Sequence, residues 1–310
     1  MDKFWLKSYP KGVPENVDIT QYSSVGALME EAFTKFASRP AYECMGKTLS
    51  FSQVDKMSQQ LGAYFQSLGF VRGDRIAIMM PNVLQYPIAL AAVMRAGFIV
   101  VNVNPLYTPR ELEHQLNDSG AKAIVILENF AATLAAVIDK TPCKTVVMAK
   151  MGDLLGALKG SLVNLVVKHL KKMVPAYSLP KRVSVIEFNE ALNKGSSHQL
   201  IRAQLSHNDV AILQYTGGTT GISKGAMLLH KTLIANLLSS EAWMQPGLHK
   251  KGKIEQPTFV CALPMYHVFA LVSCVLLAMR TGGFNILIPN PRDIPGVVKT
   301  LQGKSFNIFP

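Results

Sequence analysis

Glycine, threonine and serine residues gather around one lysine in the stretch 213–226, which reads LQYTGGTTGISKGA. Glycines let the backbone turn tightly and bring its N–H groups close to a ligand. The hydroxyl groups add hydrogen-bond donors, and Lys224 adds a mobile positive charge. This combination suits the phosphate groups of a nucleotide, which bind in concave arrays of backbone N–H groups.

The spacing of this stretch differs from that of two well-known phosphate loops. A Walker loop has the pattern G-x-x-x-x-G-K-[ST] and leads into a helix, whereas here Lys224 precedes the last glycine and residues 226–229 are typical of a strand. The dinucleotide fingerprint G-x-G-x-x-G is absent. The alternative is a flexible hairpin without a ligand, but so many special residues exceed what a chain reversal needs, and we favour phosphate binding.

The stretch 215–225, YTGGTTGISKG, resembles the signature of the adenylate-forming enzymes, which include acyl-CoA synthetases, luciferases and peptide-synthetase adenylation domains. The stretches 264–271 (PMYHVFAL) and 289–296 (PNPRDIPG) resemble the bacterial long-chain fatty acid–CoA ligases in particular. The likeness runs from the N-terminus to residue 310. It implies ATP, Mg²⁺ and CoA as cofactors and a long-chain fatty acid as substrate, which is converted to acyl-CoA through an acyl-adenylate with release of AMP and pyrophosphate.

The resemblance also implies roles for individual residues. Acyl adenylation brings a carboxylate against the α-phosphorus of ATP, so the protein must neutralise negative charge and align the reactants. Lys224 and His267 are the expected catalytic residues, and Thr216 is expected to help hold Mg²⁺. The expected nucleotide-binding residues are Tyr215, Thr216, Gly217, Gly218, Thr219, Thr220, Gly221, Ser223, Lys224 and Gly225.

His267 lies between a strand pattern and an apolar helix pattern, where a lone histidine is often a hydrogen-bonded core group. By the resemblance it orients the reactants and stabilises charge. It is not expected to act as a general base, because a carboxylate nucleophile is already ionised near neutral pH. The apolar residues that follow suit either an acyl tunnel or plain core packing: Phe269, Leu271, Val272, Val275 and Leu276. Leu271 stands where some family members carry an aromatic gate, which argues against gating by this residue.

Composition narrows the class of partner. The 310 residues carry 32 Lys and Arg against 20 Asp and Glu, a net charge of +12 that favours an anionic partner such as a nucleotide, CoA or anionic lipid. We do not expect nucleic acid, because no nucleic-acid-binding motif is present. The four cysteines are scattered, which argues for reduced thiols and against zinc. The first residues lack the apolar segment of a secretory signal, so we expect a cytoplasmic location.

Hydrophobic patterns predict alternating helices and strands. Helices are predicted at 25–36, 50–68, 84–96, 108–120, 130–138, 233–243, 268–279 and 294–302, and strands at 75–80, 98–103, 123–127, 145–148, 210–213, 226–229, 258–263, 284–288 and 305–309. This rhythm predicts an α/β fold of mostly parallel sheets flanked by helices. The resemblance implies an incomplete N-terminal domain of the acyl-adenylate-forming fold.

The predicted organisation has three parts. Residues 1–45 form an N-terminal arm, 46–205 a first α/β subdomain, and 206–310 the start of a second one that carries the glycine-rich stretch. The polar stretch 184–204 is taken as the boundary between the subdomains. An insertion at about 152–182 contains an amphipathic basic helix within 161–174, which suits either an anionic membrane surface on the inner face of the membrane or an ordinary solvated face.

The family's later motifs are missing after Gly225, where the acidic residues are Glu241, Glu255 and Asp293. We therefore expect the N-terminal portion of a longer ligase, with the CoA site outside these residues and no turnover by the portion alone. Two alternatives remain. One is a non-catalytic nucleotide- or acyl-binding module, and the other is an adenylate-forming ligase for another carboxylic acid.

Overall fold

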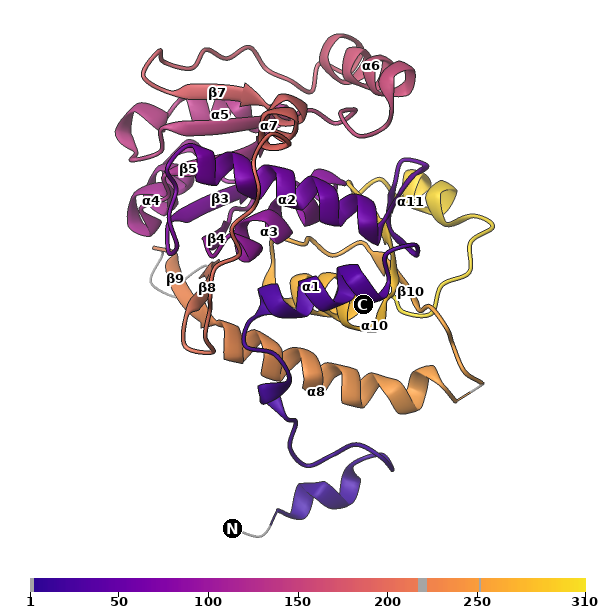
Figure 1. Cartoon of the computed structure of the whole chain (residues 1–310). Helices are drawn as coiled ribbons and strands as arrows, with labels where there is room; N and C mark the ends of the chain where they lie inside the picture. Colours follow the sequence, from indigo (N-terminus) through magenta and orange to yellow (C-terminus); the bar gives the residue numbers. More distant parts are fainter. Residues whose placement is uncertain (1–2, 217–221, 251) are drawn as a thin grey trace.

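The computed structural model describes residues 3–216, 222–250 and 252–310 (Figure 1). Within these residues the strands form two sheets. The larger sheet has seven strands in the order β7-β6-β5-β3-β4-β8-β9, and the smaller has four in the order β10-β11-β1-β2. The strand bounds are Pro40–Cys44 (β1), Lys47–Ser50 (β2), Arg75–Met79 (β3), Ile99–Asn102 (β4), Ala123–Leu127 (β5), Thr145–Ala149 (β6), Ser184–Glu187 (β7), Val210–Thr216 (β8), Lys224–Leu229 (β9), Thr258–Cys261 (β10) and Phe284–Leu287 (β11).

Helices connect these strands. Their bounds are Val25–Lys35 (α1), Phe51–Ser67 (α2), Gln85–Arg95 (α3), Pro109–Ser119 (α4), Ala131–Ala135 (α5), Ala157–Leu165 (α6), Phe188–Gly195 (α7), His230–Leu248 (α8), Val268–Ala270 (α9), Leu277–Thr281 (α10) and Ile294–Leu301 (α11). Short 3₁₀ turns lie at Phe4–Ser8 (η1), Ile19–Gln21 (η2), Glu128–Phe130 (η3) and Ile138–Lys140 (η4), and π-helical stretches at Val166–Leu170 (η5) and Leu271–Leu276 (η6).

The predicted α/β fold of mostly parallel sheets is confirmed. Neighbouring strands from β7 across to β8 run parallel, as do β10, β11 and β1, while β9 and β2 pair antiparallel with their neighbours. All residues of β5 and β6 are buried. Strands buried on both faces are the reason that these segments are near-continuous apolar runs in the sequence.

Local capping signals fix two helices where the sequence predicts them. The Ser50 side chain accepts from the backbone N–H of Gln53, whose side chain accepts in return from the N–H of Ser50. Thr108 and Glu111 make the same reciprocal pair at the start of α4, and Gly120 ends that helix with φ of 61°. Each reciprocal pair supplies acceptors for backbone N–H groups that a helix start leaves free.

The stretch 184–204 is not simply a polar boundary, and that prediction is corrected. It forms strand β7 on the edge of the larger sheet and helix α7, which packs against α2. Three of the four residues of β7 are exposed, because an edge strand presents little surface to the core. The sequence therefore shows no apolar run there.

The two sheets do not follow the predicted division of the chain. Helix α1 lies in the core with Val25, Leu28 and Met29 buried, and β1 pairs with β11, so the predicted arm 1–45 includes core elements. Strands β8 and β9 belong to the larger sheet, across the predicted boundary at 205. In Figure 1, α1 lies between α3 and α8, and η1 lies beyond α8.

Three C-terminal elements differ in extent from the prediction. Helix α8 begins at His230 and continues to Leu248 through Pro246, beyond both ends of the helix predicted at 233–243. The segment after His267 is helical but includes the π-helical stretch η6. In place of a strand at 305–309, Ile308 forms a single parallel bridge with Phe259.

In the insertion, α6 and η5 together run from Ala157 to Leu170, so the helical residues begin and end earlier than the basic helix predicted within 161–174; α6 lies at the edge of the molecule in Figure 1. Lys168 in η5 pairs with the nearly buried carboxylate of Glu128, at 2.9 Å between Nζ and Oε1. In the part of the chain that the structure describes, no helix has the length and apolarity needed to cross a bilayer.

Candidate functional site

The glycine-rich stretch joins β8 to β9 as an antiparallel hairpin at the edge of the larger sheet. Thr216 lies opposite Lys224, and Tyr215 lies opposite Gly225. Five of the predicted nucleotide-binding residues lie outside the described residues: Gly217, Gly218, Thr219, Thr220 and Gly221. Because β8 runs parallel to β4, the hairpin leaves the sheet at the carboxyl ends of its strands, where open α/β sheets bind ligands.

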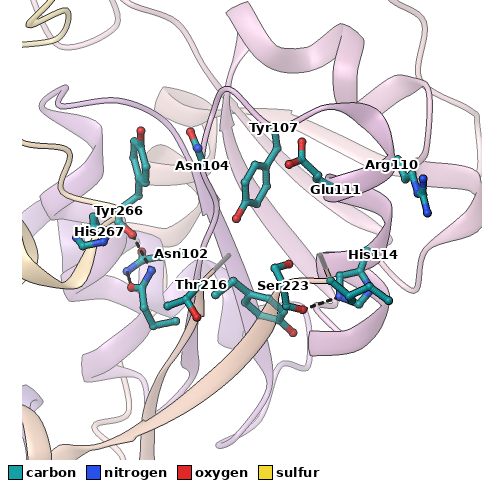
Figure 2. Close-up of a pocket in the computed structure, with 13 residues that line it drawn as sticks. Asn102, Asn104, Tyr107, Arg110, Glu111, His114, Thr216, Ser223, Tyr266 and His267 are labelled. Atoms are coloured by element: carbon teal, nitrogen blue, oxygen red, sulfur yellow. Dashed lines mark hydrogen bonds between the residues drawn. The ribbon is translucent and has the colours of Figure 1, made fainter. Parts of the chain in front are cut away.

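A cavity of about 640 Å³ opens beside this hairpin (Figure 2). Its wall combines the hairpin, the connection from β4 into α4, and the segment before α9. The lining residues are Asn102, Asn104, Tyr107, Arg110, Glu111, His114, Gln214, Tyr215, Thr216, Ile222, Ser223, Tyr266 and His267. The structure therefore brings Tyr215, Thr216, Ser223 and His267 to one space, although His267 is far from the hairpin in sequence.

Lys224 and Gly225 are placed differently from the other predicted residues. Lys224 is exposed at the start of β9, and neither residue is part of the cavity wall. A Cβ atom on Gly225 would lie 2.8 Å from Cζ of Tyr215. Gly225 thus leaves room for the tyrosine ring, which is a structural reason for a glycine at this position.

Helix α4 holds both limbs of the hairpin. The Tyr215 hydroxyl donates to Oδ2 of Asp118, and Nε2 of His114 lies 2.9 Å from the carbonyl oxygen of Ser223. Burial, together with the Asp118 carboxylate, raises the pKa of the Tyr215 hydroxyl above its usual value. The hydroxyl therefore stays protonated at neutral pH and remains a hydrogen-bond donor.

His267 is the N-cap residue of α9. Its Nδ1 accepts from the backbone N–H of Phe269 at 3.4 Å, which leaves Nε2 to carry the proton of the neutral ring. Of the residues suited to a tunnel or to core packing, Leu271, Val272, Val275 and Leu276 lie in the main hydrophobic core, whereas Phe269 is 55% exposed.

Residues of α4 and of the connection that precedes it were not predicted as part of the site. Tyr107, Arg110, Glu111 and His114 line the cavity, and Figure 2 shows Tyr107 and Glu111 across the space from Thr216. Arg110 adds a permanent positive charge. The sequence signal that could have identified them is their position just after the buried strand β4, because polar residues that follow a buried parallel strand lie at the ligand-binding edge of the sheet.

A second cavity of about 440 Å³ shares Tyr266 with the first. It lies where the carboxyl ends of the parallel strands of both sheets meet, and its wall is largely apolar. Its apolar lining includes Leu106, Leu127, Phe130, Met151, Met173, Ala262 and Ile288. A polar cavity and an apolar one thus lie on either side of Tyr266.

Comparisons with known proteins identify the family of the chain. A family model described as AMP-binding enzyme matches residues 29–310. The chain is 50% identical over 307 residues to a long-chain-fatty-acid–CoA ligase of Escherichia coli O157:H7, covering 99% of this chain and 54% of the relative. It is 48% identical over 309 residues to the ligase of the same name from Haemophilus influenzae, again covering 99% of this chain and 54% of the relative.

The fold has known counterparts as well. The crystal structure of the anthranilate CoA ligase AuaEII in complex with anthranoyl-AMP superposes with a TM-score of 0.75 at 19% identity, covering 94% of this chain and 51% of that chain. At this identity the likeness shows the fold alone. The chain spans about half the length of the curated relatives it matches.

Proposed function

The chain belongs to the AMP-binding enzyme family, and we propose that the protein activates long-chain fatty acids. In the proposed reaction a fatty-acid carboxylate attacks the α-phosphorus of ATP, a new oxygen–phosphorus bond forms, and pyrophosphate leaves. The thiolate of CoA then attacks the carbonyl carbon of the acyl-adenylate, and AMP leaves. The proposal is carried by the hairpin of β8 and β9, which stands beside His267 in a chain that is 50% identical along almost its whole length to a long-chain-fatty-acid–CoA ligase.

The proposed roles follow from the charges involved. The hairpin holds the phosphates of ATP, with Tyr215, Thr216 and Ser223 on the cavity side and Lys224 supplying positive charge from the start of β9. Gly217, Gly218, Thr219, Thr220 and Gly221 complete the proposed loop. Nε2 of His267 donates to the negative charge that develops on the reacting oxygens. Fixed donors of this kind stabilise a transition state without reorganising during the reaction.

The residues fit a Mg²⁺ ion that takes most of its ligands from ATP. Magnesium keeps several waters and binds through few protein oxygens when phosphates are present. In the described part of the chain no three His, Cys, Asp or Glu side chains cluster as a metal site. The Thr216 hydroxyl is the protein oxygen proposed to hold the ion, which when bound neutralises charge on the phosphates.

The acyl chain requires an apolar space next to the nucleotide. The second cavity meets that requirement, because it is lined by apolar side chains and is separated from the polar cavity by Tyr266. A fatty acid with its chain in the second cavity would direct its carboxylate towards His267. Chain-length preference would then follow from the depth of the apolar space.

The test uses the full-length protein and measures pyrophosphate release as a function of the fatty acid. Lys224→Met should lower kcat/KM on the order of 10²-fold, the usual effect of removing one stabilising group. Lys231→Met is the matched control, because Lys231 is also exposed but lies in the first turn of α8 and is not part of the cavity wall. Equal activity in all three proteins would refute the role of Lys224.

The same assay tests the substrate class. A series of acids from short to long chains, together with aromatic acids and amino acids, should give the highest kcat/KM for long-chain fatty acids. A preference for another acid would point to a different adenylate-forming ligase. Nucleotide binding without pyrophosphate release from any acid would point to a non-catalytic binding module.

We also propose that α6 and η5 dock on an anionic membrane surface. Leu158, Leu162 and Leu165 recur at helical spacing and are 91%, 62% and 53% exposed, so their apolar faces point to solvent. Lys171 and Lys172 are exposed just beyond η5. An exposed apolar stripe flanked by cations matches an interfacial helix, and long-chain fatty acids partition into bilayers.

Sedimentation with vesicles tests this docking. The full-length protein should sediment with vesicles that contain phosphatidylglycerol and less with vesicles of phosphatidylcholine. Leu162→Glu should abolish the difference. Ile201→Glu is the control, because Ile201 is 74% exposed on another part of the surface. Unchanged sedimentation of Leu162→Glu would eliminate this face as the membrane contact.

A further inference from the structure

The backbone segment that carries His267 is held by a buried side chain from the connection after β3. Asn82 follows β3 and is 2% exposed. Its Nδ2 donates to the carbonyl oxygens of Cys261 and Leu263, both at 2.9 Å, and its Oδ1 accepts from the backbone N–H of Met265 at 2.9 Å. These bonds fix the first part of the segment between β10 and α9.

The second part of this segment is held by a chain of three buried side chains. Nε2 of Gln214 donates to the carbonyl oxygen of Tyr266 at 3.2 Å, and Oε1 of Gln214 accepts from Nδ2 of Asn102 at 3.3 Å. The hydroxyl of Tyr86 lies 2.8 Å from Oδ1 of Asn102 and 2.7 Å from the carbonyl oxygen of Met265. The three side chains are at most 5% exposed.

Gln214 lies between the strand that enters the proposed phosphate loop and the segment that carries His267. Gln214 precedes Thr216 by two residues in β8, and side chains two residues apart in a strand share one face. The amide of Gln214 also reaches the carbonyl oxygen of Tyr266, which directly precedes His267. One amide side chain therefore joins the strand that enters the phosphate loop to the backbone that presents the histidine.

Hydrogen-bond counting shows that the members of the chain depend on one another. The Tyr86 hydroxyl has one proton and faces two acceptors, Asn102 Oδ1 and the Met265 carbonyl. The orientation of the Asn102 amide in turn determines whether Gln214 can direct its NH₂ group at Tyr266. A buried polar group that loses its partner is strongly unfavourable, so these orientations are fixed together.

We propose that Gln214 is a positioning residue that sets the location of His267 relative to the phosphate loop, with Asn102 and Tyr86 holding its amide in the required orientation. The inference rests on the proposed function for its kinetic test. Gln214 and Asn102 also line the polar cavity, and the inference gives the contact between the two sheets a role in aligning the two reactants. Misplacement of a reacting group by about 1 Å can lower a rate on the order of 10²-fold.

Gln214→Met tests this role in the full-length protein, because it removes the amide and keeps the length of the side chain. We expect kcat for fatty-acid-dependent pyrophosphate release to fall at least about 10-fold. Backbone hydrogen exchange in the peptide 261–270 should become faster. Tyr86→Phe removes only the hydroxyl and should change the same quantities in the same direction, even if Gln214→Met does not fold.

Gln115→Met is the matched control. Gln115 is also buried, and its Nε2 donates to the backbone carbonyl of Asn102 at 2.8 Å, so it supports the same strand without reaching Tyr266. An equal loss of kcat in Gln115→Met and Gln214→Met would show a general packing effect and overturn the proposal. Unchanged kcat in Gln214→Met would overturn it as well.

The hydrogen-exchange measurement separates failure of this inference from failure of the proposed function. If wild type released no pyrophosphate with any acid, the proposed function would fail. Faster exchange at 261–270 in Gln214→Met but not in Gln115→Met would still establish the coupling between β8 and this segment. Identical exchange in the two variants would refute the coupling whatever the reaction.

Discussion

The buried histidine at the start of α8 gives the protein a pH-dependent contact. His230 is 2% exposed, and its Nδ1 accepts from the backbone N–H of Val25 in α1 at 3.1 Å. Burial lowers the pKa of His230 from 6.5 to about 4, with Asp209 opposing this shift and His207 adding to it. Protonation of Nδ1 would remove the acceptor and place a charge in the core, so we expect the contact between α1 and α8 to weaken in acid.

Linkage gives the sign and the size of this effect. Because the folded-state pKa lies below the unfolded value, the unfolded chain binds the proton more readily. The stabilisation is therefore complete above about pH 6.5 and is lost as the pH falls towards 4. A pKa of about 4 in the folded state corresponds to a loss of about 2 kcal/mol between pH 7.5 and pH 5.

Asp153 changes the stability in the opposite direction over the same pH range. Its burial raises the pKa of this carboxyl from 3.8 to about 6. The folded state then binds the proton more readily, so stability rises as the pH falls, by about 1 kcal/mol between pH 7.5 and pH 5. A comparison of wild type with a variant of His230 separates the contribution of the histidine from those of Asp153 and the other titrating groups.

Hydrogen exchange of peptides from α1 and α8 is the appropriate assay, because it reports local opening within the full-length protein. Rates at pH 7.5 and pH 5 are corrected for the intrinsic pH dependence of exchange. Between pH 7.5 and pH 5, the stability of His230→Gln should decrease by about 2 kcal/mol less than that of wild type, because the glutamine amide does not titrate. His198→Gln removes an exposed histidine and should behave as wild type. An identical pH dependence of wild type and His230→Gln would refute the argument.

Three further predictions concern single contacts. Gly225→Ala should destabilise the protein by about 1–3 kcal/mol by overpacking against the Tyr215 ring. In thermal melts, the double variant Gly225→Ala with Tyr215→Ser should lose less stability than the two single variants lose together. Tyr215→Phe removes the bond to Asp118 and should lower the stability by about 1.5–3 kcal/mol in chemical denaturation, whereas no change would mean that the bond contributes nothing. Arg95→Met should lower the free energy of unfolding by about 3–5 kcal/mol in the same assay, because the Arg95 side chain is fully buried and pairs with Glu30 at 2.6 Å. A decrease below about 1 kcal/mol would contradict this prediction.

Much of the fold could be predicted from sequence because its signals are local. The capping residues at Ser50 and Thr108 act on backbone groups within three residues, and the apolar runs of β5 and β6 record burial on both faces. Elements without such signals were missed. Strand β7 is exposed at a sheet edge, and helix α7 follows directly in a stretch that looks polar.

The candidate site also contains residues that the sequence identified and residues that it missed. The glycine-rich hairpin and His267 stand out by residue type and spacing. The contribution of α4 does not, because Tyr107 and His114 reach the cavity only after β4 and β8 pair side by side. The role of Gly225 in making room for a tyrosine ring also depends on that pairing.

By itself, the sequence determined the family, the alternation of strands and helices, and the hairpin proposed to bind phosphate, since each depends on residues close together in the chain. Only the tertiary structure decided that β1 joins β11, that Gln214 reaches the backbone of Tyr266, and that the leucines of α6 face solvent. The physical reason is that periodicity records how far each side chain is buried, whereas the partner that buries it is selected by contacts between segments that are distant in sequence.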